Sequence, residues 1–257
     1  MSAMAGTMRS EWTKFRTIPS NVAILLATVA VMVGAGALTA NGASRGYRGA
    51  GAAFDATYIS MYGGFLFVQI AVGSLGVLVV TSEYATGMIR TSLTVVPRRG
   101  RLLAAKVWTF GLIALVTGEI AAFGAFLFGQ TVISAAGAPP AALGQAGVLR
   151  AVVGMGLIWV LVGLTGVAFG SLLRDTMAAT TVVVAVNFVI PIIGPRLMPD
   201  AVGDWVTTYW PISAGLQVTT TVPHAERLAP WTGLGLMAGF TAVLLMVSFA
   251  VFRSRDA

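Results

Sequence analysis

The chain has 257 residues, of which 57% are hydrophobic and only 10% charged, and its mean hydropathy is +0.87. A soluble domain carries about 25% charged residues, so this composition excludes a soluble globular protein and predicts a surface that faces lipid. The absence of cysteine excludes disulfides and thiolate metal sites, and the formal charge of +7 does not indicate a nucleic-acid partner, because the basic residues flank apolar runs.

The N-terminal segment 8–18 has the pattern of a short amphipathic helix. Met8, Trp12 and Phe15 are spaced i, i+4 and i+7, so they share one helical face. The charged residues lie largely off that face: Arg9, Glu11, Lys14 and Arg16. We therefore expect an interfacial helix in the plane of the lipid headgroups, with Trp12 at the boundary. The alternative is a short charged tail that only orients the first span.

Six apolar segments are long enough to cross a bilayer, which takes roughly 20 residues each: 21–40, 58–81, 102–130, 149–172, 177–193 and 231–252. We expect a single all-α, multi-pass domain, 1–257, in the plasma (inner) membrane. If the N-terminus is cytoplasmic, eleven of the 16 basic residues lie inside: Arg9, Lys14, Arg16, Arg90, Arg98, Arg99, Arg101, Lys106, Arg174, Arg253 and Arg255. The other five lie outside: Arg45, Arg48, Arg150, Arg196 and Arg227. This asymmetry places both termini in the cytoplasm.

The loop 82–101 joins the second and third spans and is strongly basic. Five basic residues lie between positions 80 and 107: Arg90, Arg98, Arg99, Arg101 and Lys106. The only acidic residue in that stretch is Glu83. Such a loop stays on the cytoplasmic side, and we expect a helix over 83–93 that ends before Pro97.

A continuous helix over 83–93 would place Glu83, Gly87 and Arg90 on one face, at i, i+4 and i+7. Gly87 would let that face approach another molecule closely. Glu83 would lie at the membrane end, where it can pair with a basic residue of the N-terminal helix, Arg16 or Lys14.

Two polar residues lie within predicted spans. Glu119 is deep in the third span, where a carboxylate costs on the order of 3 kcal/mol. Two interpretations stay open: Glu119 lines a substrate path or relays a proton, or it packs against a neighbouring helix. Asn187 precedes Pro191 in the fifth span and is better explained as an interhelical contact at a kink.

Small-residue pairs predict close helix packing in two places. Gly166 and Gly170 are four residues apart in the fourth span, and Gly235 and Gly239 are four apart in the sixth. The region 195–230 is rich in aromatic residues and poor in charge. We expect it to form one or two short helices at, or dipping into, the outer leaflet, as a reentrant element, rather than a solvated loop.

Residue patterns for catalysis are lacking. The two lysines, Lys14 and Lys106, do not follow a glycine, so the sequence holds no phosphate-binding loop. The single histidine, His224, is in an outer loop, which excludes paired-histidine zinc sites and histidine-based triads. The sequence predicts no enzyme active site of its own, no cofactor and no metal.

The chain resembles the membrane subunit of type-2 (export-type) ABC transporters, most closely the actinobacterial permeases. The residues that carry the resemblance are R-S-E-W-T-K-F-R-T at 9–17 and E-Y-A-T-G-M-I-R-T-S-L-T at 83–94, with P-R-R-G-R-L-L-A-A-K after them. The likeness in topology extends over essentially the whole chain.

The resemblance implies a homodimeric half-transporter that works with a separate ABC ATPase subunit, which hydrolyses the ATP. Substrate would cross at the dimer interface, and a drug, a peptide or a lipid-like molecule would suit the family. The loop 82–101 would hold the coupling helix, with Glu83, Gly87 and Arg90 as the residues that match the family motif. The alternative is a membrane channel that works without an ATPase, or a structural or regulatory membrane protein. A channel is less well supported, because the sequence has no filter-like Thr-Val-Gly-Tyr-Gly stretch.

Overall fold

The structure, a computed structural model, describes residues 3–47, 54–95, 98–222 and 227–254. These residues form helices and no strand, which confirms the predicted all-α polytopic fold. Six of the described helices are long and apolar enough to cross a membrane: α2 (Pro19–Arg45), α3 (Ala56–Ala85), α5 (Arg99–Ala135), α6 (Val148–Leu173), the segment Thr176–Leu197, and α11 (Pro230–Ser254). Each contains one of the six predicted spans.

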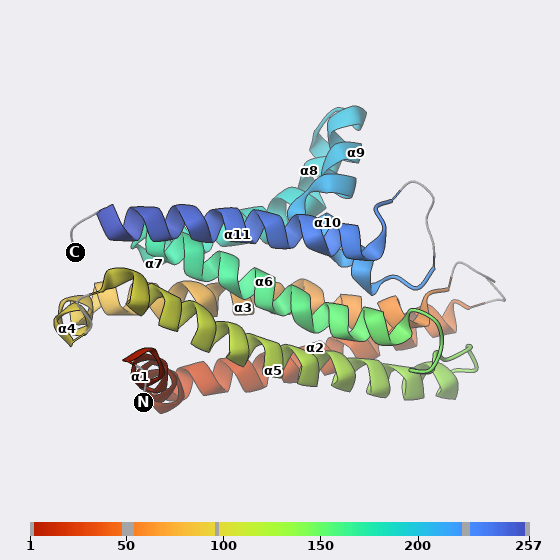
Figure 1. Ribbon diagram of the computed structural model, residues 1–257. Helices are drawn as coiled ribbons and strands as arrows, with labels where there is room; N and C mark the ends of the chain where they lie inside the picture. Colours follow the sequence, from red (N-terminus) through yellow and green to blue (C-terminus); the bar gives the residue numbers. More distant parts are fainter. Residues whose placement is uncertain (1–2, 48–53, 96–97, 223–226, 255–257) are drawn as a thin grey trace.

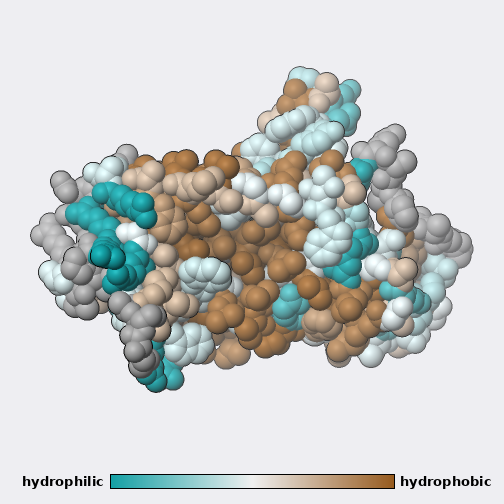
Figure 2. Space-filling view, in the orientation of Figure 1, coloured by the Kyte–Doolittle hydropathy of each residue, from teal (hydrophilic) through white to brown (hydrophobic). Residues whose placement is uncertain are grey.

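Two of the spans form the centre of the bundle. In α3 and α6, 61% and 67% of the most apolar window is buried, against 17% in α2 and 22% in both the fifth span and α11. Figure 1 shows α2, α3, α5, α6 and α11 side by side along a common direction. Hydrophobic residues cover the middle of the face in Figure 2, and hydrophilic ones lie mainly toward its two ends. The peripheral spans therefore present apolar surfaces outward, as lipid or another protein requires.

Glycines allow α3 and α6 to touch backbone to backbone. A methyl group on Gly166 would collide with the carbonyl oxygen of Gly73, and one on Gly76 with that of Gly163. Gly170 of α6 lies against Val77 of α3. The prediction of close packing at Gly166 and Gly170 is therefore confirmed.

The second glycine pair behaves differently. A methyl group on Gly235 or Gly239 would meet no atom of the described residues within 4 Å. Close packing of these two glycines within the chain was wrong, because the face of α11 that carries them points away from the bundle. Both glycines are exposed on the outside of a peripheral span.

One end of the molecule, which we call the α4 end, holds α1 (Ala3–Thr17), α4 (Met88–Val95) and the last turns of α11 (Figure 1). The first turns of α5 lie here too. With 37 residues α5 is about 55 Å long, well beyond the roughly 30 Å of a hydrocarbon core. Its N-terminal turns, which carry Arg99 and Arg101, therefore extend past the apolar layer.

The segment 8–18 is helical, as predicted, within α1, and its buried side differs from the hydrophobic face read from the spacing of Met8, Trp12 and Phe15. The buried residues are Thr7, Glu11 and Phe15, whereas Trp12 is 47% exposed. The charged Glu11 points into the bundle because it pairs there with the buried Lys106. Trp12 lies on the outer side of the helix. The alternative of an unstructured charged tail does not describe this segment, which is helical from Ala3 to Thr17.

The fifth span bends at a π-helical turn. It runs as α7 (Thr176–Val184), η2 (Ala185–Val189) and α8 (Ile190–Leu197). In η2 the amide of Ile190 bonds the carbonyl of Ala185, five residues back. The next such bond would need an N–H on Pro191, which proline lacks. The carbonyl of Val186 is freed, and the indole N–H of Trp210 donates to it at 2.7 Å.

The aromatic-rich region 195–230 contains the short helices predicted for it. They are α9 (Asp200–Tyr209), α10 (Pro211–Gly215) and the 3₁₀ turn η3 (Leu216–Thr219). In Figure 1 α8 and α9 project from the side of the bundle, while α10 lies along α11. Buried residues of α10 and η3, Ile212 and Val218, belong to the main core. The residue His224 of this region lies outside the described residues.

Candidate functional site

The predicted helix over 83–93 is interrupted, which corrects the placement of its motif residues. Helix α3 continues to Ala85, so Glu83 belongs to the membrane span and not to the short helix α4. Gly87 has a φ of +70°, the left-handed conformation that ends helices, and its N–H bonds the carbonyl of Tyr84 at 3.1 Å. Glu83 and Arg90 therefore do not share one helical face.

Gly87 also has a different role from the one expected. A methyl group there would meet nothing within 4 Å, so no close approach requires glycine in this structure. Its positive φ does require it, since L-residues with a side chain avoid this region. Gly87 thus turns the chain from α3 into α4. The side chain of Arg90 lies outside the described residues, as does Pro97, the predicted end of the helix.

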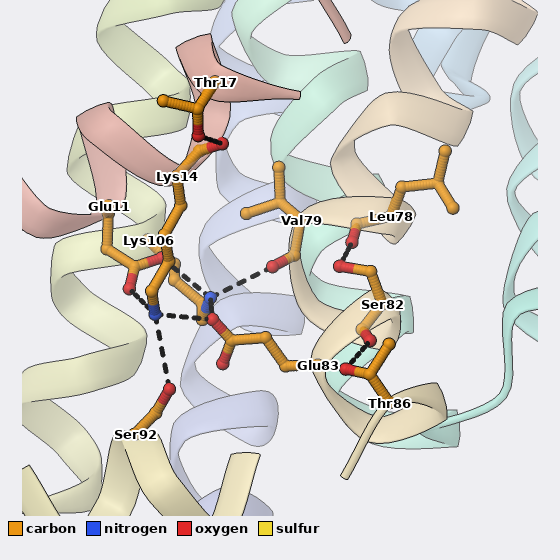
Figure 3. Close-up of polar contacts among 10 residues, drawn as sticks. All are labelled: Glu11, Lys14, Thr17, Leu78, Val79, Ser82, Glu83, Thr86, Ser92 and Lys106. Carbon is orange, nitrogen blue, oxygen red and sulfur yellow. Dashed lines mark hydrogen bonds and ion pairs between the residues drawn. The ribbon is translucent and has the colours of Figure 1, made fainter. Parts of the chain in front are cut away.

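Four charged residues from three helices form one ion cluster (Figure 3). Its members are Glu11 and Lys14 of α1, Glu83 of α3 and Lys106 of α5. The Lys106 Nζ lies 2.8 Å from Oε2 of Glu11 and 2.8 Å from Oε1 of Glu83, and donates to the carbonyl of Val79 at 3.1 Å. The Lys14 Nζ lies 2.8 Å from Oε1 of Glu11 and 2.8 Å from Oε1 of Glu83. Each lysine therefore bridges both carboxylates.

The ion cluster is electrically neutral and mostly buried. The side chains of Lys106, Glu83 and Glu11 are 2%, 3% and 6% exposed, and only Lys14, at 31%, reaches solvent. Burial lowers the pKa of Lys14, but the hydrogen bonds to Glu11 and Glu83 outweigh it and raise the pKa above its ordinary value. Removing one partner of such a cluster leaves an uncompensated buried charge, which costs about 3–5 kcal/mol.

The ion cluster reaches α4 through a single side chain. The Lys14 Nζ donates to the hydroxyl of Ser92 at 3.3 Å. On the same helix Ile89 is 4% exposed and belongs to a hydrophobic core cluster with Phe15 of α1 and Leu102 of α5. Among the described residues, α4 is thus attached to the bundle by a polar contact with α1 and by the apolar packing of Ile89 in this core cluster.

The sequence interpretation identified part of this site. It predicted that Glu83 would pair with Arg16 or Lys14, and Lys14 is the residue that the structure places there. It missed Glu11 and Lys106, which it assigned to a solvent face and to a basic loop. A signal was available for Lys106: a lone charge among Leu, Ala, Val and Trp needs an acidic partner.

Arginines gather beside the ion cluster at the start of α5. They line a cavity of about 530 Å³ together with Gly100: Arg98, Arg99, Arg101 and Arg253. The guanidinium of Arg253, at the end of α11, lies over the backbone of Gly100, where a methyl group would be 2.8 Å from its Nε. The α4 end thus combines a short helix with a strongly positive surface, which suits an acidic partner.

The two polar residues of the spans have separate surroundings. The carboxyl group of Glu119 lies against Gly156 of α6, and its Oε2 is buried with no hydrogen-bond partner among the described residues. It is 13 residues beyond Lys106 on α5, about 20 Å along the helix, so it is not part of the ion cluster. The Asn187 Nδ2 donates to Oγ1 of Thr165 at 3.3 Å and to the carbonyl of Val183 at 3.1 Å, which is an interhelical contact at a bend.

Comparisons with known proteins and the search for a metal site add no assignment. Neither the models of known protein families nor the curated proteins include a match to this chain. Among the described residues, no group of three or more His, Cys, Asp or Glu side chains is placed to hold a metal ion.

Proposed function

We propose that this chain is the membrane-spanning subunit of an ATP-driven exporter, a half-transporter that pairs with a second copy and with a separate ABC ATPase. The observation that carries the proposal is the α4 end. There a short helix stands off the second span, is tied to the N-terminal helix through a buried ion cluster, and is bordered by arginines. We take this end as cytoplasmic, because it holds most of the basic residues.

A partner that supplies energy is part of the proposal because the chain has no phosphate-binding loop. A helix that packs on the bundle can transmit a movement of the ATPase to the membrane spans, whereas a free loop cannot. The substrate class that we propose is a drug, a peptide or a lipid-like molecule, as the resemblance implies.

The second copy of the chain is proposed from the peripheral spans. In α2, the fifth span and α11 less than a quarter of the apolar window is buried in the single chain. Met177 of α7 is 79% exposed, and the threonines beside it line an open groove: Thr176, Thr180 and Thr181. Because the chain has no native cysteine, Met177→Cys gives a single cross-linking site. A cross-linked homodimer in native-like lipid is expected, and fully active monomeric particles would refute it.

The coupling claim is tested by a charge reversal on α4. Arg90→Glu should weaken binding of a co-expressed ATPase at least tenfold, which corresponds to about 1.4 kcal/mol. Arg196→Glu makes the same charge change on the exposed surface of α8 and serves as the matched control. Equal ATPase binding and stimulation by the two variants would contradict the proposal. It would favour the alternative, a channel or a structural membrane protein that works without an ATPase.

The orientation is tested independently of coupling. A reporter fused after Arg99 should be cytoplasmic, and one placed within 203–220 should be external. A cytoplasmic signal from 203–220 would contradict the six-span arrangement.

A further inference from the structure

A cavity of about 190 Å³ lies beneath α1, next to the ion cluster. It is partly open and is lined by the junction of α1 and α2, by α3 and α5, and by Met88 of α4. Most of its wall is apolar: Phe15, Ile18, Leu78, Phe110 and Ile113. The wall also carries polar side chains, among them Glu83, Lys106 and Thr109. The cavity therefore offers both apolar and polar contacts.

Two polar atoms of that wall have no hydrogen-bond partner among the described residues. They are Oε2 of Glu83 and Oγ1 of Thr109. Both residues are more than nine-tenths buried, with Glu83 2% and Thr109 7% exposed. Buried polar groups are nearly always hydrogen-bonded, so a pair of unsatisfied atoms on one cavity wall indicates a missing partner. The partner must donate to the carboxylate oxygen and can accept from the threonine hydroxyl.

The charges around the cavity select a neutral partner. Lys14 and Lys106 already balance Glu11 and Glu83, so a cation would add an uncompensated charge to a buried site. An anion would face the unpaired oxygen of Glu83, which repels it. A hydroxyl group satisfies both atoms without changing the net charge.

The volume limits the size of the ligand. Pockets that enclose drug-sized molecules measure roughly 300–1,000 Å³, and this cavity is smaller. We propose that it binds a small neutral amphiphile, with a hydroxyl group between Glu83 and Thr109 and an alkyl or ring body against Phe110 and Ile113. This site does not depend on the proposed transport function, because the argument uses only the cavity and its wall.

A photoreactive octanol that carries a diazirine on its chain is the probe for this site. With the full-length protein in detergent micelles, we expect saturable labelling of residues from α3 and α5 that line the cavity. Unlabelled 1-octanol should compete, whereas octyl methyl ether, which cannot donate to Glu83, should compete about five- to tenfold less well. Non-saturable labelling spread over the exposed faces of the spans would overturn the proposal. Equal competition by alcohol and ether would overturn it too, because the site would then recognise only an apolar chain.

A matched pair of variants separates recognition from folding. Thr109→Val keeps the shape of the side chain but removes the unpartnered hydroxyl, so the protein should fold as well as before. It should bind the octanol probe about five- to tenfold more weakly. Thr117→Val makes the same change two turns further along α5, where the hydroxyl already bonds the carbonyl of Ile113 at 2.7 Å and lines no part of the cavity. Unchanged binding in the Thr109 variant would show that the Thr109 hydroxyl takes no part in binding the probe and would refute the proposal.

Discussion

Replacing Lys106 with methionine should strongly destabilise the protein. The Lys106 ammonium has three acceptors within 3.1 Å: Glu11, Glu83 and the carbonyl of Val79. Methionine is unbranched and only one atom shorter than lysine, but it removes the charge and all three hydrogen bonds. The two carboxylates then share Lys14 alone, so one buried negative charge is left uncompensated. A change of this kind costs about 3–5 kcal/mol.

Lys14→Met provides the matched control, because Lys14 contacts the same two carboxylates at the same distances. Its side chain is 31% exposed, so water can replace part of what is lost. We expect a cost of about 1–2 kcal/mol, between the values for exposed and buried ion pairs. The double variant Lys106→Met with Glu83→Gln restores the charge balance and should recover part of the loss.

The measurement is the free energy of unfolding in mixed micelles as the fraction of a denaturing detergent is raised, followed by circular dichroism. The reasoning is refuted if Lys106→Met costs no more than Lys14→Met, or if both cost less than 1 kcal/mol. The pH dependence adds a check of sign. Because the pKa of Lys14 is raised above its ordinary value of 10.5, its contribution should be fully present below pH 10.5 and be lost as the pH rises through the higher pKa.

Three further predictions concern the backbone and its contacts, and the same unfolding measurement checks each. Gly87→Ala should cost about 1–2 kcal/mol because φ is +70°, and Gly87→Asn less, because asparagine tolerates that conformation; equal costs would contradict the cap. Gly166→Ala should cost several times as much as Gly235→Ala, since only the first methyl group meets backbone; a similar effect at both would argue against the packing of α3 on α6. Trp210→Phe should cost about 1 kcal/mol by removing the bond to the π-helical turn, while Trp205→Phe on an exposed face should be neutral.

The number and position of the spans could be predicted from the sequence because they depend on local composition. A run of about 20 apolar residues has few alternatives in a chain with so little charge. The pairing of Glu83 with Lys14 could also be predicted, because an acidic residue at the end of a span needs a basic partner. Few basic residues are expected close to that end of the span. The contact at Gly166 could be predicted because Gly166 and Gly170, four residues apart, leave one helix face without side chains.

Other features depend on tertiary partners that local patterns do not reveal. Hydrophobic spacing in α1 identified the side with Trp12 but could not show that Glu11 turns into the bundle, where it pairs with the buried Lys106. Sequence spacing likewise could not show that α3 ends at Ala85. A glycine four residues after a glutamate fits either a continuous helix or a left-handed residue that ends the helix. Only the backbone conformation in the structure distinguishes the two. For Gly235, the spacing predicted close packing, but the spacing alone does not show whether another helix lies against that face.

The N-terminal helix α1 contributes to the packing of α4 on the bundle. Ser92 of α4 bonds Lys14, and Ile89 packs in the core cluster that contains Phe15; both Lys14 and Phe15 are residues of α1. Helix α1 is in turn fixed to α5, through the pair of Glu11 with Lys106 and through the rings of Phe15 and Phe110, whose centroids are 6.2 Å apart. Helix α1 therefore links α4 to the third span, while the turn at Gly87 links α4 to the second. A loop attached only at its two ends would lack the link through α1.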